Sequence, residues 1–172
     1  MEKFITSKEI KKRVQQIAAA IALEHKQSNC TLPPVFVCVL NGGFMFFNDL
    51  IRELRQIDVN VEVDFIRIKS YNGRSNANGL DVIKDFDIDL KGKRVYIVDD
   101  MCETGATLME AVSLASNRMP LDVKVVTVIE RKNGYHMSDH VCFTVETDQW
   151  LVGYGLDNNQ LDRTLEDIYT IN

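Results

Sequence analysis

Apolar residues recur along this chain with two different periods, and the two periods follow one another in order. Apolar positions at helical spacing from Ile10 to Ile21, preceded by a capping box of Thr6 and Glu9, predict an amphipathic helix over residues 7–25. Short, nearly continuous apolar runs are typical of buried strands in a parallel sheet. Such runs cover residues 35–40, 95–98 and 123–129. A helical pattern follows the first two runs, with inward positions at Phe47, Leu50, Ile51 and Leu54 and then at Leu108, Ala111, Val112 and Ala115.

A longer segment has the two-residue period of a strand. Residues 59–68 place Val61, Val63 and Phe65 on one face, and the opposite face holds Glu62, Asp64, Ile66 and Ile68. Residues 81–87 are expected to pair back on this strand. The order of the elements predicts an α/β fold with a doubly wound, mostly parallel sheet, flanking helices and one antiparallel addition. A chain of 172 residues with 45% hydrophobic content suits one domain over residues 1–172.

The segment after the longer strand has a different composition. Residues 72–79 read Asn-Gly-Arg-Ser-Asn-Ala-Asn-Gly and are rich in turn formers. Such a segment predicts a mobile loop, and loops of this kind often act as lids over a ligand.

The run from Val95 to Thr107 concentrates the most chemistry. An apolar strand leads into Asp99, Asp100 and Glu103, and then into Thr104-Gly105-Ala106-Thr107 at the start of a helical pattern. Ligands of open α/β sheets bind beyond the carboxyl ends of the strands. Adjacent carboxylates repel each other and are stabilised by a cation such as Mg²⁺ or by a polyhydroxyl ligand. The unpaired N–H groups of a helix start favour a phosphate. A phosphosugar bound with a divalent ion is therefore predicted, although a solvated acidic loop would share each separate feature.

The whole string resembles the 5-phosphoribosyl-1-pyrophosphate motif of type I phosphoribosyltransferases. Three further segments, residues 39–50, 63–71 and 150–163, are similar to the hypoxanthine-guanine branch, in order and at appropriate separations. The resemblance covers almost the whole chain. It implies the type I phosphoribosyltransferase fold, with a flexible lid loop and a small hood built from the termini.

The resemblance also implies roles for matching residues. Asp99 and Asp100 would hold the ribose hydroxyls and support Mg²⁺, and the phosphate cradle would be Thr104, Gly105, Ala106 and Thr107. The pyrophosphate turn would be Leu40, Asn41 and Gly42, with a non-proline cis peptide, and pyrophosphate would also contact Ser70, Tyr71 and Arg163. Without the family, these positions indicate only a turn, a strand end and a surface arginine.

The purine-binding residues implied by the resemblance are Arg131, Trp150, Leu151 and Asp157. Trp150 would stack on the base, although a lone tryptophan near a strand is otherwise typical of a core position. Asp157 would be a further Mg²⁺ ligand. Glu103 would be the general base that accepts the purine proton.

Three residues depart from the family pattern. Glu103 stands where an aspartate is usual, which places the carboxylate one methylene farther from the backbone. Arg131 replaces a lysine, exchanging a compact ammonium for a planar fork that could alter discrimination among 6-oxopurines. Asn41 replaces the lysine of the pyrophosphate turn. These departures concern rate and base preference more than the reaction.

Composition limits the partners and the cellular compartment that we expect for the chain. A net charge of −5 argues against general nucleic-acid binding. The four cysteines have no Cys-x-x-Cys spacing, which favours a reducing cytoplasm. Neither a signal peptide nor a membrane-spanning run is evident, so a soluble intracellular protein is expected. Apolar faces on the early helices, together with the resemblance, favour a homodimer or homotetramer.

Other functions stay open at this point. A sister phosphoribosyltransferase would prefer xanthine, orotate, adenine or uracil, although the segment from Trp150 to Asp157 argues for a 6-oxopurine. A non-catalytic regulator that binds 5-phosphoribosyl-1-pyrophosphate is a second alternative. The spacing of His136 and His140 is a weaker candidate for a metal site, because no third ligand is evident.

Overall fold

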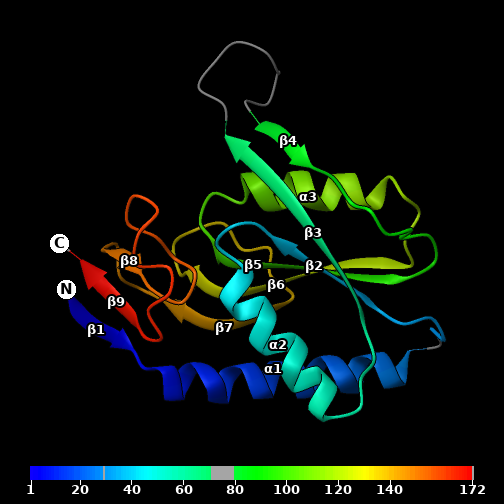
Figure 1. Ribbon diagram of the computed structural model, residues 1–172, viewed down its shortest axis with the longest axis horizontal. Helices are drawn as coiled ribbons and strands as arrows, with labels where there is room; N and C mark the ends of the chain where they lie inside the picture. The colour runs from blue at the N-terminus through cyan, green and yellow to red at the C-terminus, as the bar shows by residue number, and fades with distance from the viewer. Residues whose placement is uncertain (29, 71–79, 172) are drawn as a thin grey trace.

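The computed structural model describes residues 1–28, 30–70 and 80–171. In these ranges a six-stranded sheet has the order β4-β3-β2-β5-β6-β7 (Figure 1). Its strands β2, β3, β5, β6 and β7 pair in parallel, and β4 pairs antiparallel to β3. The strands are β2 (Val35–Val39), β3 (Glu62–Ser70), β4 (Leu80–Lys84), β5 (Arg94–Cys102), β6 (Asp122–Arg131) and β7 (His140–Val145). The predicted mostly parallel sheet with one antiparallel strand is confirmed.

Helices cover both faces of this sheet. Figure 1 shows α1 (Ser7–Gln27) and α2 (Phe44–Gln56) on one face and α3 (Ala106–Ser116) on the other. Successive side chains of β5 lie on opposite faces of the sheet and enter two separate hydrophobic cores. Tyr96 and Val98 pack in the core that includes α1 and α2, whereas Val95 and Ile97 pack in the core that includes α3. The doubly wound arrangement buries both faces of the central strands.

A second, three-stranded sheet forms the predicted hood. Its order is β1-β9-β8, with antiparallel pairing of β1 (Glu2–Ile5), β9 (Ile168–Ile171) and β8 (Trp150–Val152). The two ends of the chain therefore lie side by side (Figure 1). The hood leads into α1 at Thr6, where the predicted capping box with Glu9 is present.

Several predicted boundaries were wrong by a few residues, for identifiable reasons. The strand predicted from Val59 begins at Glu62, because the Val59 N–H donates to the Leu54 carbonyl at the end of α2. The strand predicted over 81–87 ends at Lys84. The strand that contains Val95 runs on through both acids to Cys102, paired with β6. The predicted lid residues 72–79 and Tyr71 lie outside the described residues, as do Asn29 and Asn172.

None of the helices in the described ranges is both long and apolar enough to span a membrane.

One buried carboxylate ties the edge of the main sheet to the segment after β4. Asp64 is 4% exposed and accepts N–H groups from Phe65, Asp87 and Ile88 at 2.7, 2.7 and 3.0 Å. Lys84 Nζ lies 3.2 Å from the same carboxylate. The bonds from Asp87 and Ile88 explain why the predicted strand stops early, since these N–H groups face Asp64 rather than a neighbouring strand.

Replacing Asp64 with alanine is expected to destabilise the protein by roughly 3 kcal/mol. The change leaves buried N–H donors and the Lys84 ammonium without their acceptor. Burial alone would raise the pKa of Asp64, but the hydrogen bonds from Ile88, Phe65 and Asp87 outweigh burial and lower it. The stability from Asp64 is therefore complete above pH about 3.9 and lost as the pH falls through the lower native pKa. Chemical denaturation at pH 3–7 measures both effects.

Asp87→Asn is the matched control for this substitution. Asp87 also pairs with Lys84, at 3.0 Å, but its side chain is 79% exposed. Its removal is expected to change stability by no more than about 0.5 kcal/mol. Equal losses in the two variants would contradict the role given to burial.

Candidate active site

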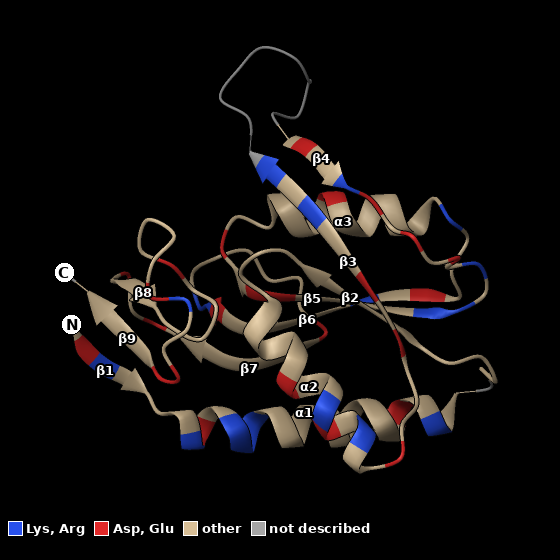
Figure 2. Ribbon diagram, in the orientation of Figure 1, with Lys and Arg blue, Asp and Glu red and all other residues tan. Residues whose placement is uncertain are grey.

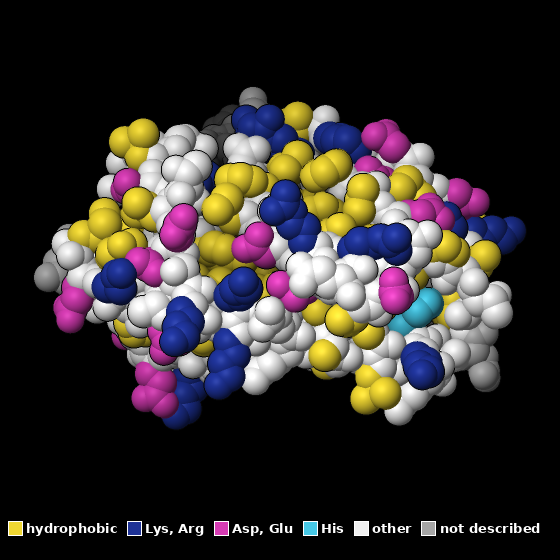
Figure 3. All heavy atoms as spheres, turned by 60° about the horizontal axis from the view of Figure 1, so that its bottom comes forward, with side chains coloured by type: hydrophobic (Ala, Val, Ile, Leu, Met, Phe, Trp, Pro, Cys, Tyr) yellow, Lys and Arg dark blue, Asp and Glu magenta, His cyan; other side chains and the backbone are white. Residues whose placement is uncertain are grey.

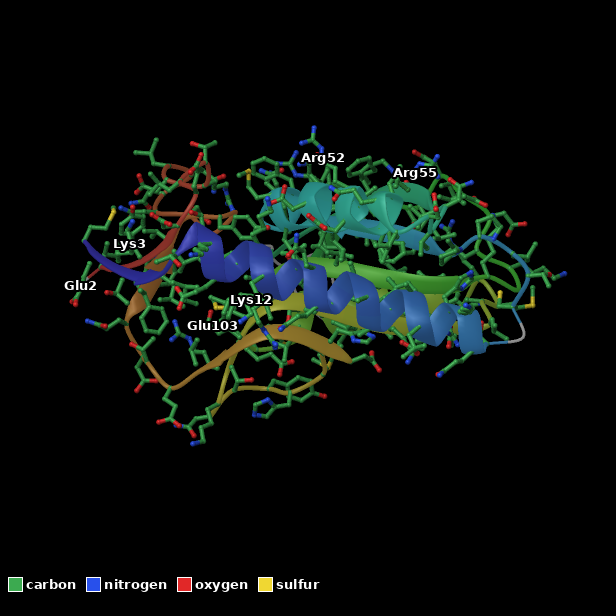
Figure 4. All side chains as sticks on the ribbon, turned by 90° about the horizontal axis from the view of Figure 1, so that it is seen from below. Glu2, Lys3, Lys12, Arg52, Arg55 and Glu103 are labelled. Atoms are coloured by element: carbon green, nitrogen blue, oxygen red, sulfur yellow. The ribbon has the colours of Figure 1, made fainter. Side chains whose placement is uncertain are left out.

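The parallel sheet brings the predicted site residues to one edge. The turn at residues 40–43 follows β2, residues 99–105 span the end of β5, Arg131 ends β6, and residues 146–149 follow β7. Parallel strands share the edge at which they end. Figure 4 shows the labelled Glu103 toward the end of the molecule where Glu2 and Lys3 of β1 lie. The hood therefore stands beside the carboxyl edge of the sheet.

The acid pair lies within the last residues of β5. Asp99 is 7% exposed, and its Oδ1 accepts the Asp100 N–H at 2.8 Å. Asp100 Oδ1 accepts the Met101 N–H at 2.8 Å. Burial, and next the charge of Asp100, raise the pKa of Asp99 well above its ordinary value. Burial also raises the pKa of Asp100, against an opposing effect of its hydrogen bonds and of Arg163. The pair is therefore electrostatically unsatisfied without a cation or hydroxyl donors.

A cavity of about 250 Å³ opens beside this pair and is lined by Asp99 to Met101 and by Glu103 to Leu108. Gly105 has φ +75° and caps α3, whose first intrahelical bond runs from the Met109 N–H to the Gly105 carbonyl at 2.8 Å. The N–H groups before Met109 have no intrahelical acceptor. Apart from the Ala106 N–H, which lies 3.4 Å from Thr104 Oγ1, the cavity thus joins backbone donors without an intrahelical acceptor to a helix dipole, which is the arrangement that binds a phosphate.

Tyr135 supports this cradle from outside, which the sequence did not suggest. A Cβ atom added to Gly105 would lie 2.5 Å from the Tyr135 ring, so the ring packs directly on the glycine. The Tyr135 N–H donates to the Glu103 carbonyl at 3.3 Å, and its carbonyl lies 3.1 Å from Cys102 Sγ. The loop after β6 therefore holds both sides of the turn at residues 102–105.

The turn after β2 packs against the acid pair. Its Leu40–Asn41 peptide is cis, as the resemblance implied. A Cβ atom on Gly42 would lie 2.0 Å from Asp100 Oδ2, and one on Gly155 would lie 2.1 Å from the Gly42 carbonyl oxygen. Gly155 also has φ +104°. The turn, the acid pair and the C-terminal segment therefore meet at contacts that only glycine allows.

Replacing Gly155 with alanine is expected to lower stability by about 2–4 kcal/mol and to reduce activity. The new methyl group overlaps the Gly42 carbonyl, and the positive φ is unfavourable for alanine. Gly92→Ala is the matched control, because Gly92 has φ +69° but its Cβ would meet only Leu32, at 4.0 Å. Denaturant unfolding should show a much smaller loss for Gly92→Ala. Equal losses would mean that backbone conformation alone, and not the contact with Gly42, makes Gly155 necessary.

A second cavity, of about 180 Å³, adjoins the first. Its lining consists of Asp100, Met101, Glu103, Arg131, Trp150, Leu151, Leu156 and Asp157. A cavity of roughly 150 Å³ accepts a benzene ring, so this one suits a small aromatic base. Trp150 is 56% exposed, and its Nε1–H donates to the Asp157 carbonyl at 2.9 Å. Trp150 is therefore a surface side chain oriented by its indole N–H, and its core interpretation was wrong.

Arg163 and Asp157 are paired with each other. Arg163 Nη2 lies 2.8 Å from Asp157 Oδ1, and the Gln160 N–H donates to Asp157 Oδ2 at 2.8 Å. Arg163 Nη1 donates to the Gly155 carbonyl at 2.7 Å, while its buried Nε has no acceptor among the described residues. Within those same residues no three His, Cys, Asp or Glu side chains converge as a metal group. Both carboxylate oxygens of Asp157 therefore have partners within the C-terminal segment, and its role as a Mg²⁺ ligand beside Asp99 and Asp100 stays a prediction.

Glu103 and Arg131 both line the second cavity and form an ion pair there. Glu103 is 54% exposed, and its Oε1 lies 3.6 Å from Arg131 Nε. Arg131 is 13% exposed and donates from Nη1 and Nη2 to the carbonyls of Thr147 and Gln149. The two departures from the family pattern are therefore neighbours, with the exposed carboxylate paired to a guanidinium that backbone carbonyls hold.

The remaining candidate residues are Ser70, Tyr71 and the two histidines. Ser70 ends β3 at the same edge, whereas Tyr71 is outside the described residues. His136 lies 3.2 Å from Glu130 and 2.9 Å from the Lys132 carbonyl, and His140 pairs with Glu24 at 3.1 Å. The two histidines therefore have separate partners.

A larger cavity, of about 440 Å³, lies between α1 and α2. On the face that carries these helices, Figure 3 shows apolar side chains among charged ones of both signs. Its lining includes the Asp49 carboxylate, which accepts the Tyr154 hydroxyl at 2.9 Å, and Ser7 at the start of α1, whose N–H already donates to Asp167 at 2.6 Å. The two smaller cavities carry the candidate chemistry.

Comparisons with known proteins match the family that the sequence motifs resemble. The family model of the phosphoribosyl transferase domain matches residues 6–159. The hypoxanthine phosphoribosyltransferase of Escherichia coli is 33% identical, covering 96% of this chain and 92% of that protein. The hypoxanthine-guanine-xanthine phosphoribosyltransferase of Tritrichomonas foetus is 30% identical, covering 94% and 90%. The hypoxanthine phosphoribosyltransferase of Trypanosoma cruzi in complex with the product IMP has a TM-score of 0.92 at 29% identity, covering all of this chain and 94% of that one.

Proposed function

The chain belongs to the phosphoribosyltransferase family, and from that premise we propose that it is a purine-salvage enzyme formed by one domain over residues 1–172. It transfers the 5-phosphoribosyl group from 5-phosphoribosyl-1-pyrophosphate to a 6-oxopurine, hypoxanthine or guanine, and releases pyrophosphate. The observation that carries this proposal is the junction of the two cavities, which share Asp100, Met101 and Glu103. A ligand with a phosphate at one end and a base at the other would place its ribose over these residues.

Different residues bind different parts of that ligand. The backbone donors of Thr104 to Thr107 bind the 5-phosphate, and the acid pair accepts the ribose hydroxyls. Pyrophosphate lies toward the turn at Leu40, Asn41 and Gly42. The buried Nε–H of Arg163, which has no acceptor in the described structure, supplies a hydrogen-bond donor at that end. Ser70 and Tyr71 contribute to closure over pyrophosphate and exclude water.

Transfer exchanges one bond at ribose C1 for another. The bond between C1 and the pyrophosphate oxygen breaks, and its electron pair leaves with pyrophosphate. A purine ring nitrogen bonds to C1, and the Glu103 carboxylate accepts the proton that the purine loses. The carboxylates beside the ribose stabilise the positive charge that develops on the ring. Trp150 stacks on the base, and the Leu151 backbone contacts its edge.

The acid pair fits Mg²⁺ held jointly with substrate. This ion commonly binds one or two carboxylates together with phosphate oxygens and waters, and Asp99 and Asp100 are adjacent carboxylates with raised pKa values. When bound, Mg²⁺ would neutralise the negative charge that develops on the leaving pyrophosphate.

A homodimer is the proposed assembly. Phe44, Val63 and Phe65 are 37%, 42% and 37% exposed, and the Phe65 ring lies 5.6 Å from that of Phe47. Apolar side chains gathered on α2 and β3 suit an isologous interface. Sedimentation should therefore give twice the chain mass or a multiple of it, and Phe65→Lys should lower that mass.

The proposed location is the cytoplasm, with small-molecule substrates and neither nucleic acid nor membrane as partner. All four cysteines, namely Cys30, Cys38, Cys102 and Cys142, are free thiols. Basic and acidic segments alternate along α1 (Figure 2), rather than forming one basic face on that helix. Both features are consistent with a reducing compartment and a small anionic ligand.

The test is nucleotide formation with separate bases. The protein is mixed with Mg²⁺, 5-phosphoribosyl-1-pyrophosphate and hypoxanthine, guanine, xanthine or adenine. We expect product with hypoxanthine or guanine and little with adenine. Xanthine as the best base would favour the sister specificity. An absence of product with every base would contradict the enzyme proposal and favour a binding protein.

A further inference from the structure

Arg131 makes contacts that a side chain would not need if it only bound the base directly. Its guanidinium donates to the Thr147 carbonyl through Nη1 and to the Gln149 carbonyl through Nη2, the latter at 3.0 Å. Its Nε lies 3.6 Å from the Glu103 carboxylate. One planar group from the end of β6 therefore spans the loop after β7 and the acid at the end of β5.

The loop that Arg131 holds leads directly into Trp150. Residues 146–149 connect Val145, the last residue of β7, to Trp150, the first residue of β8. Val145 is paired with Arg131 in the sheet, and its carbonyl accepts the Lys132 N–H at 2.8 Å. The strand pairing thus fixes one end of the loop. The two carbonyls bound by Arg131 fix the end next to Trp150.

Trp150 and Glu103 line the same cavity as Arg131. The distance between the indole and the carboxylate sets the space for a base, so a group tied to both sides controls its width. A lysine could not replace this contact, because a single ammonium lacks the planar fork that reaches two carbonyls and a carboxylate together.

We propose that Arg131 is a positioning residue. Its guanidinium links the loop at 146–149 to the main sheet, a link called the strap below, and so sets the positions of Trp150 and Glu103 around the base. This inference rests on the proposed function for its kinetic consequences, but not for the strap itself. It differs from the direct purine contact that the resemblance implies for Arg131. The strap makes the position of Trp150 depend on the shape of residue 131 and not only on its charge.

The single tryptophan of the chain makes the strap measurable without any substrate. Arg131→Lys keeps the charge and Arg131→Met removes it, while both lose the fork. In the ligand-free protein we expect both variants to shift the emission of Trp150 and to increase its quenching by acrylamide. The control is Lys132→Met, since Lys132 is the next residue, is 60% exposed and makes an exposed ion pair with Glu146 of the same loop, a kind of contact that adds little rigidity. Its Trp150 signal should match that of the wild type.

Kinetics separate positioning from direct contact. Loss of the strap should raise KM for the purine about tenfold or more in both Arg131→Lys and Arg131→Met. KM for 5-phosphoribosyl-1-pyrophosphate should stay within about twofold, because the phosphate cradle does not contact Arg131. Unsubstituted purine, which lacks the 6-oxygen, can be tested as a competitive inhibitor. Its affinity for the two Arg131 variants, relative to the wild type, should fall by the same factor as that of hypoxanthine.

The two proposals fail in different ways. An unchanged Trp150 signal in both Arg131 variants would overturn the strap, as would a change in Arg131→Met that Arg131→Lys does not share. A selective loss of hypoxanthine relative to purine would also overturn it in favour of direct contact with the 6-oxygen. If the wild type made no nucleotide with any base, the proposed function would fail, but the fluorescence comparison would still decide the strap.

Discussion

Glu103→Gln is expected to lower turnover by about a hundred- to ten-thousandfold, with little change in substrate binding. The substitution keeps the size and the hydrogen-bonding oxygen of the side chain but removes its ability to accept a proton, and general-base assistance is typically worth that much. The side chain is 54% exposed, so its replacement should not disturb the fold. Steady-state kinetics at several pH values, with product-nucleotide binding measured separately, test this expectation.

Glu103→Asp is the matched control. It keeps the carboxylate and restores the shorter acid of the family pattern, so we expect it to keep most of the activity. Its carboxylate also moves away from Arg131 Nε, now 3.6 Å from Glu103. Near-normal turnover in Glu103→Gln would remove Glu103 from the catalytic role, whatever Glu103→Asp does.

Asp99→Asn is expected to have opposite effects on activity and stability. Activity should fall at least about a hundredfold, because a charge aimed at the ribose and the ion is lost. The ligand-free protein should gain about 0.5–2 kcal/mol, or about 2–4 °C in Tm per kcal/mol. The gain is expected because asparagine keeps an acceptor for the Asp100 N–H, now bound at 2.8 Å, without burying a second negative charge.

The pH dependence of this gain has a definite sign. Burial and the Asp100 charge raise the pKa of Asp99 above that of the unfolded chain, so the native state binds the proton more tightly. The stability from that proton is complete below pH about 3.9 and is lost as the pH rises through the native pKa. The advantage of Asp99→Asn should therefore grow from acid to neutral pH. A variant less stable than the wild type at pH 7 without ligand would contradict this account.

The local geometry of the stretch that carries the candidate chemistry could be predicted from its own sequence. Asp99 to Thr107 form a strand end, a turn and a helix start, and each depends on neighbours a few residues away. The cradle and the acid pair needed no knowledge of the rest of the fold. The amphipathic pattern of α1 was equally local, and its apolar residues from Ile10 to Ile21 are buried.

The contacts that the sequence could not supply join distant segments. Gly155 lies against Gly42, and Tyr135 packs on Gly105. Asp64 was placed on the correct strand face, but its partners after β4 could not be known, because an isolated acid in a strand does not specify which N–H groups will reach it. The same limit explains Asp157, whose pairing with Arg163 depends on how the C-terminal segment turns back.

The most direct test of the central claim is the stoichiometry of products from one reaction. With Mg²⁺, 5-phosphoribosyl-1-pyrophosphate and hypoxanthine, the wild-type protein should release one pyrophosphate for each IMP formed, and omission of hypoxanthine should nearly abolish pyrophosphate release. Pyrophosphate released at the same rate without a base, or no IMP with hypoxanthine present, would contradict the claim that this site transfers phosphoribose to a purine.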